Sequence, residues 1–217
     1  MRKRFLKFVF VVLLCCGGLT QAVPITIQIT GNVTSIGGTG RASVSDTIYA
    51  GVSFIGTYTY DSATPDSDAN PQRGSYLHNS PYGISIALGG YEFKTASSHV
   101  GQFKISITND DATNFPAIDY YSVFSDKNAS VPSAGLTIDY ISWTLGDSTH
   151  SVFSSDALPV TVPMLTDWNY NVLAISGDDS LGHSTVITCT VTQAELVPEP
   201  MTSILTAIGI IFFRRRR

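Results

Sequence analysis

The stretch Ile84-Ser-Ile-Ala-Leu-Gly-Gly-Tyr-Glu-Phe-Lys94 decides the fold class of this chain. Apolar residues occupy every second position on both sides of Gly89-Gly90, which is the period of a strand with one buried face. Glycine tolerates the positive φ that a type I′ turn requires. The segment therefore predicts an antiparallel β-hairpin.

The same alternation recurs along the chain on both sides of this hairpin. No segment between the two ends keeps a helical period over three turns, and turns rich in Gly, Asn and Asp separate the apolar runs. We therefore predict an all-β fold, a single antiparallel β-sandwich over residues 23–195, with a jelly roll or closed barrel as the alternative. The other predicted strands are Ile25–Ile29, Val52–Tyr60, Phe103–Ile107, Ile118/Tyr120 with Phe124, Leu136–Leu145, Trp168–Ile175 and Thr185–Thr192.

The last predicted strand has the clearest two faces. Ile187, Cys189 and Val191 are expected to point inward, with threonines between them pointing outward. Cys189 is expected to be a packed thiol rather than a nucleophile, because its neighbours are threonines. Residues 192–197 are expected to form a short tether.

Charge is distributed unevenly over the 217 residues, whose formal net charge is −4. Charged residues make up 14% of the chain, against roughly 25% in a typical soluble domain. The thirteen basic residues include four in the first seven positions and four at the last four. Residues 23–197 keep five basic residues against sixteen acids, which leaves −11. Such a body is unsuited to binding nucleic acid, which needs clustered Lys and Arg.

Residues 1–22 have the three parts of a secretory signal peptide. A basic start, Arg2 to Lys7, precedes the apolar run Phe8–Leu14, and small residues lead to a cleavage site after Ala22. The alternative is an uncleaved anchor, but this run is broken by Gly17-Gly18 and is shorter than the roughly twenty residues that span a bilayer. Residues 1–22 therefore predict export through the secretion translocon.

The C-terminal tail, residues 196–217, contains the motif Pro198-Glu199-Pro200, an apolar segment and a basic end. As a helix the short apolar segment Met201–Phe213 would reach about 20 Å, less than the roughly 30 Å hydrocarbon core. The positive-inside rule predicts that the arginines stay cytoplasmic. The basic end consists of Arg214, Arg215, Arg216 and Arg217.

This tail resembles the PEP-CTERM sorting signal of Gram-negative bacteria. The resemblance implies recognition by an exosortase, transient anchoring in the inner membrane, and delivery to the cell surface or the extracellular space. It also implies a place among exopolysaccharide- and biofilm-matrix-associated proteins. The alternative is a plain tail anchor. We expect a non-enzymatic, exported cell-envelope or matrix protein.

One loop carries a candidate metal site. Asp66, Asp68 and Asn70 form a D-x-D-x-N run, an alternation that can turn three oxygen ligands toward calcium. The glycine and the distal glutamate of an EF-hand are absent. The alternative is a solvated turn, which the same residue types favour. No other cofactor is predicted.

Catalytic motifs are absent from the sequence. The four histidines are not at metal-ligand spacing, and no G-x-S-x-G, P-loop or G-x-G-x-x-G occurs. Acids such as Asp119 and Asp139 could supply a glycosidase pair. We predict no enzymatic activity, with a glycosidase as a further alternative.

Aromatic residues support a second functional hypothesis, a carbohydrate-binding module that calcium could assist. Tyr120 and Tyr121 are adjacent, so one of them must face away from the core of a strand. Tyr76, Tyr82 and Trp168 lie beside predicted loops. Such residues could stack on the sugars of an extracellular polysaccharide, although strands also favour aromatics for packing.

Overall fold

The computed structural model describes residues 24–41, 44, 46–111 and 118–198. Ala22, Glu199, Pro200 and the four terminal arginines, together with the predicted signal peptide and apolar helix, lie outside the described residues. Among the residues described, no helix is long and apolar enough to cross a membrane.

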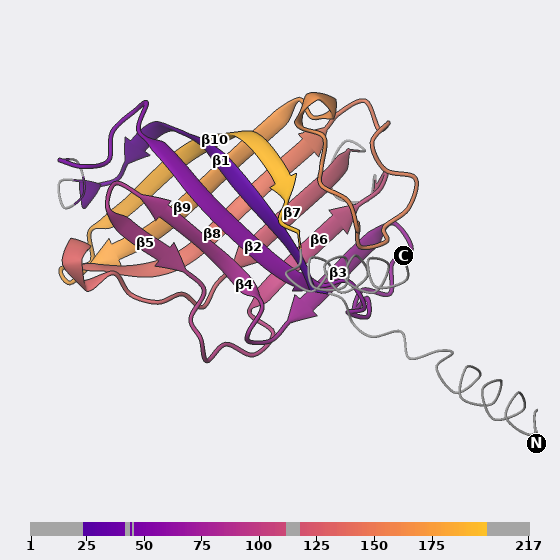
Figure 1. Ribbon diagram of the computed structural model, residues 1–217, viewed down its shortest axis with the longest axis horizontal. Helices are drawn as coiled ribbons and strands as arrows, with labels where there is room; N and C mark the ends of the chain where they lie inside the picture. The colour runs from indigo at the N-terminus through magenta and orange to yellow at the C-terminus, as the bar shows by residue number, and fades with distance from the viewer. Residues whose placement is uncertain (1–23, 42–43, 45, 112–117, 199–217) are drawn as a thin grey trace, which may run out of the picture.

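Within this part of the chain, ten strands form one sheet in the order β3-β6-β7-β8-β9-β10-β1-β2-β4-β5, and every neighbouring pair is antiparallel (Figure 1). The strands are β1 (Pro24–Gly37), β2 (Ser53–Asp61), β3 (Arg73–His78), β4 (Gly83–Leu88), β5 (Tyr91–Lys94), β6 (Phe103–Thr108), β7 (Asp119–Ser125), β8 (Leu136–Asp147), β9 (Tyr170–Asp179) and β10 (Ser184–Leu196). Two short 3-10 helices, η2 (Pro132–Ala134) and η3 (Leu165–Asp167), lie in loops.

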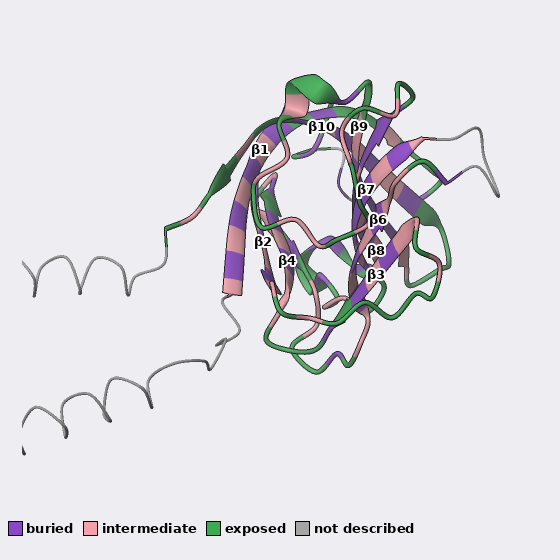
Figure 2. Cartoon of the chain, turned by 90° about the vertical axis from the view of Figure 1, so that its right-hand side faces the viewer, coloured by how far each residue is buried: buried purple, intermediate pink, exposed green. Residues whose placement is uncertain are grey.

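The predicted fold class, all-β with antiparallel strands, is confirmed. The two layers are the two halves of one continuous sheet that curls on itself. In Figure 2, β1, β2 and β4 form one wall and β3, β6, β7 and β8 form the other. The strands β9 and β10 continue the sheet from one wall to the other at the top of the view. The apolar face of each strand points into the space between the walls, so one curled sheet encloses the core.

The predicted hairpin at 84–94 is formed by β4 and β5, which pair from Leu88↔Tyr91 to Ser85↔Lys94. Gly89 and Gly90 have φ values of 59° and 83°, so both occupy the region that favours glycine. In β10 the alternation also holds, because Ile187, Cys189 and Val191 are buried. Burial raises the pKa of the Cys189 thiol to about 12, which agrees with a packed role.

One local expectation is wrong, and one that the sequence left open is settled. Residues 192–197 are not a loose tether, because β10 continues to Leu196 and pairs with β1. In β7, Tyr121 and Val123 point into the core, whereas Tyr120 and Phe124 lie on the partly exposed face. The sequence left open which of Tyr120 and Tyr121 faces outward, and the inward position of Asp119, described below, goes with the inward position of Tyr121.

Both edges of the sheet are covered by loops. Beyond β5, the Ala96 N–H donates to the Lys127 carbonyl and the Ala129 N–H to the Lys94 carbonyl, each over 2.8 Å. Beside β3, the Ser67 N–H donates to the Ser75 carbonyl over 2.9 Å. Unpaired edge strands can recruit other chains, and these bonds protect the ends of the sheet.

Candidate functional site

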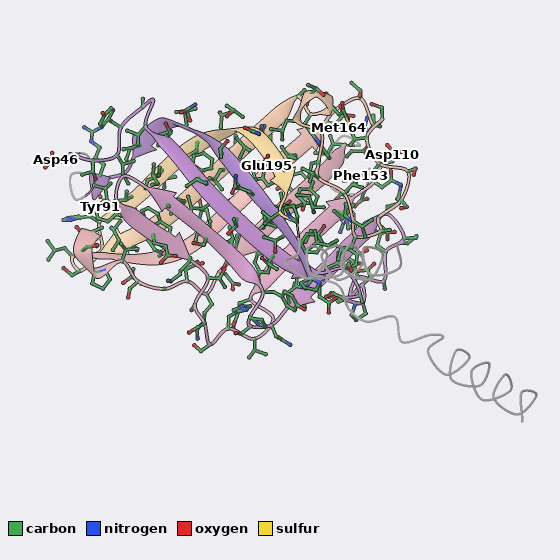
Figure 3. All side chains as sticks on the ribbon, in the orientation of Figure 1. Asp46, Tyr91, Asp110, Phe153, Met164 and Glu195 are labelled. Atoms are coloured by element: carbon green, nitrogen blue, oxygen red, sulfur yellow. The ribbon has the colours of Figure 1, made fainter. Side chains whose placement is uncertain are left out.

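The longest connection between two strands, residues 148–169 between β8 and β9, forms the candidate site. It contains η3 and no strand. Loops of this length inside a compact domain are uncommon and are often functional. Figure 3 shows it at one end of the sheet, with Phe153 and Met164 labelled and Asp110 beside them.

Two acidic side chains hold the beginning of this loop. Asp119 and Asp147 are opposite each other in the β7–β8 register, and both are buried. Asp119 Oδ2 accepts the backbone N–H groups of Val152 and Phe153 at 2.9 and 2.7 Å. Because a buried carboxylate needs such donors, the loop explains why Asp119 can point inward.

Asp147 binds the loop in the same way, through the residues that follow it. Its Oδ1 accepts the Thr149 N–H at 2.9 Å and its Oδ2 accepts the Ser151 N–H at 3.0 Å. These backbone hydrogen bonds hold the pKa of Asp147 at about 2, and the bond from Ser151 has the largest effect. The carboxylate therefore stays charged at any ordinary pH and keeps the loop attached.

Two tyrosine hydroxyls hold the middle of the loop. Tyr60 of β2 donates to the Pro159 carbonyl at 2.5 Å, and Tyr76 of β3 donates to the Asp156 carbonyl at 2.8 Å. Burial raises the pKa of both hydroxyls, so both remain donors. These two strands belong to different walls of the sheet (Figure 2). The loop is thereby fixed across the open end of the core.

A hollow of about 410 Å³ is lined almost entirely by residues of this loop. Trp168 and Phe153 pack edge to face there, with ring centroids 5.4 Å apart. The Trp168 Nε1 is buried and has no hydrogen-bond acceptor among the described residues. The hollow, which we call the loop pocket, is lined by Tyr121, residues 152–155, residues 157–164, Asp167 and Trp168.

The rim and charge of the loop pocket are distinctive. Val160 and Met164 are 61% and 68% exposed, which is unusual for large apolar side chains. Asp167 is the single charged side chain in the described lining. Sequence reasoning missed this pocket because residues 148–167 have neither strand nor helix period. The available signal was a long aperiodic segment rich in apolar residues, with Pro159 and Pro163 in it.

A second hollow, the hydroxyl groove, has a volume of about 500 Å³ and lies over β2 and β4. Tyr82, which the sequence pointed to, lines it and is half-buried. His99 is buried at its wall, with Nε2 2.6 Å from the Tyr82 carbonyl oxygen. The hydroxyl side chains of the groove are Thr57, Thr59, Ser80, Tyr82, Ser85, Thr95 and Ser97.

Three of the other aromatic candidates for sugar stacking do not present their rings. Trp168 is 8% exposed, and Tyr76 and Tyr121 are buried as well. Tyr120 lies on the outer face, where its hydroxyl is 3.3 Å from the Thr144 hydroxyl. The structure therefore brings Tyr121 and Trp168 together in the loop pocket and leaves Tyr82 in the hydroxyl groove.

The candidate calcium residues lie between β2 and β3 in a run of side-chain-capped turns. Asp66 Oδ1 accepts the Asp68 N–H, Asp68 Oδ1 accepts the Asn70 N–H, and Asn70 Oδ1 accepts the Gln72 N–H, all between 2.9 and 3.0 Å. Asp66 Oδ1 also accepts the Ser75 N–H of the edge strand β3, at 2.8 Å. These bonds give the three residues a role in holding the loop, whereas calcium binding stays a prediction.

The acids considered as a glycosidase pair are far apart. Asp119 lies opposite Asp147 at one end of β8, and Asp139 lies near the other end. At the rise of a strand this separates them by about 25 Å, too far for paired carboxylates. Among the residues described, no three His, Cys, Asp or Glu side chains are grouped to hold a metal ion.

Comparison of the chain with protein-family models, with curated proteins and with solved structures finds no match.

Proposed function

We propose that this protein is exported and sorted by an exosortase, and that its β-domain serves without catalysis at the cell surface or in the extracellular matrix. The observation that carries the proposal is that the first and last described strands lie next to the two expected signals. The first strand begins at Pro24, directly after the expected cleavage site at Ala22. The last strand ends at Leu196, directly before the Pro198-Glu199-Pro200 motif.

The pairing of β1 with β10 supports processing at both ends. Ile27 is opposite Leu196, and the Val197 N–H donates to the Thr26 carbonyl over 2.9 Å. The first and last strands therefore stabilise each other inside the sheet. Removal of residues 1–22 and of the residues that follow Pro198 would leave every described strand intact.

The processing steps follow from the sequence signals. The translocon would carry the body across the inner membrane, and the signal peptide would be removed after Ala22. The apolar segment would hold the chain in the membrane transiently, with the arginines inside, until the exosortase acts at Pro198-Glu199-Pro200. We propose a non-catalytic body because two of its buried acids, Asp119 and Asp147, hold a loop by hydrogen bonds to its backbone.

A fusion of residues 193–217 to a secreted reporter tests the sorting step. Intact mass of the reporter in each cell fraction should show loss of the tail in a strain with an exosortase and an uncut tail in a strain without it. The matched control replaces Pro198-Glu199-Pro200 with three alanines and leaves the apolar and basic parts unchanged. Equal processing in both strains would contradict the proposal.

A carbohydrate-binding role is the second candidate, and the hydroxyl groove is the observation that favours it. Serine and threonine hydroxyls beside the half-buried Tyr82 ring offer both donors and an apolar surface to a sugar. A glycan array with the purified protein, with and without calcium, tests this role. Hits that Tyr82→Ala removes would support it, and an array without hits would count against it.

A further inference from the structure

We propose that the loop pocket is a binding site for a small, uncharged and mainly apolar molecule that carries one hydrogen-bond acceptor. This site is separate from the hydroxyl groove and does not depend on the proposed function.

The first support is that hydrogen bonds from several strands fix the backbone of the loop. Four buried side chains, from strands in both walls of the sheet, bind its backbone: Asp119, Asp147, Tyr60 and Tyr76. A loop needed only to join β8 to β9 could be short, since antiparallel neighbours are commonly joined by two to five residues. The pocket is thus a fixed feature, and a ligand would not need to order it on binding.

The second support is the composition of the pocket. Its volume of about 410 Å³ is within the range of small-molecule sites, roughly 300–1,000 Å³. Phe153, Leu158 and Val162 supply apolar side chains, and the exposed Val160 and Met164 are at its rim. Exposed apolar side chains beside a concave surface mark a place where an apolar body can be buried.

The third support is the unpaired donor of Trp168. Its Nε1–H is buried without an acceptor among the described residues, although buried donors are normally paired. Trp168 lines the loop pocket, so a ligand whose acceptor atom displaces the atoms that cover Nε1 would supply the missing bond. The single charged side chain of the described lining is Asp167, so an anion would meet no opposite charge there. A ketone or an ester on an apolar body fits these conditions.

The neutral dye prodan, a naphthalene that carries a ketone, is a suitable probe. Titration of the purified full chain with prodan should show saturable binding, with energy transfer from tryptophan to the dye. Methyl benzoate, a neutral ester, should displace the dye, whereas benzoate, its anionic counterpart, should not. Absence of saturable binding, or equal displacement by both competitors, would overturn the proposal.

Three variants test whether the dye binds in the loop pocket. Trp168→Phe keeps an aromatic ring and removes the donor, so the affinity should fall about fivefold. Met164→Gln at the rim should also weaken binding, and because Met164 is 68% exposed this variant should keep the native fold. The matched control is Leu181→Gln, because Leu181 is 78% exposed and lies outside the lining. Binding by Met164→Gln that equals that of Leu181→Gln would exclude the loop pocket.

Discussion

The hydroxyl oxygens of Tyr58 and Tyr121 lie 2.9 Å apart in the buried centre of the molecule. Tyr58 belongs to β2 and Tyr121 to β7, and four strands separate these two in the sheet. Each ring also contacts Trp143 edge to face, with centroids 5.8 and 6.0 Å away. This hydrogen bond therefore joins the two walls of the curled sheet across the core.

Removal of either hydroxyl should destabilise the fold. Tyr58→Phe or Tyr121→Phe leaves the other hydroxyl buried without its partner, which costs about 1–3 kcal/mol. The double variant should lose less than the sum of the two single losses, because it removes both polar groups. Urea denaturation of the four proteins measures this coupling, and strictly additive losses would show that the hydroxyls do not stabilise each other.

Acidification should destabilise the protein through His78. Burial lowers the pKa of His78 to about 4, with the neighbouring His99 lowering it and Asp61 opposing them. In the unfolded chain the histidine has a pKa near 6.5. Above that pH, His78 is neutral in both states and its full contribution to the unfolding free energy is present. As the pH falls from about 6.5 to about 4, the unfolded chain takes up the proton before the folded chain does. The unfolding free energy should therefore fall by about 2 kcal/mol over this range.

His78→Phe tests this origin of the pH dependence. His78 lies among the rings of Tyr60, Tyr82 and Phe103, so phenylalanine suits the site. The unfolding free energy of the variant, measured between pH 6.5 and 4, should change less than that of the native chain. His183→Gln serves as the control, because the His183 side chain is 49% exposed, and it should retain the loss.

Gly31 is required where β1 bends against β10. The register of the pair shifts between Thr30 and Gly31, and a Cβ at position 31 would collide with the Thr190 carbonyl oxygen and the Phe54 ring. Gly31→Ala should therefore lower the unfolding free energy by about 2–3 kcal/mol. Gly37→Ala in the same strand has open space around it and should change stability by less than about 0.5 kcal/mol. Thermal and urea unfolding compare the two variants.

Asp66 should stabilise the loop before β3 without calcium. Its Oδ1 accepts two backbone N–H groups, those of Asp68 and Ser75, whereas Asp68 accepts that of Asn70. Asp66→Ala should thus cost about 1 kcal/mol, more than Asp68→Ala. We expect equal losses in EDTA and in millimolar calcium. A calcium-dependent rise in melting temperature that both variants abolish would instead support the candidate metal site.

The secondary structure could be predicted to a large extent because it depends on local pattern. The alternation in 84–94 and in 185–192 determines which side chains face inward, and Gly89-Gly90 determines the turn. The inward face of β7 could not be predicted, because it carries the buried Asp119. A buried carboxylate is acceptable only because the distant Val152 and Phe153 donate to it, and no local pattern reports such donors.

The sequence by itself determined the all-β class and predicted the limits of the domain and the two signals at its ends, because these follow from period, composition and the order of short motifs. Only the tertiary structure decided that the two layers are one curled sheet, that Tyr58 meets Tyr121, and that residues 148–169 line a pocket. The physical reason is that these features depend on contacts between residues far apart in the chain. Such contacts are selected by packing and by the pairing of buried polar groups, and not by the period of any one strand.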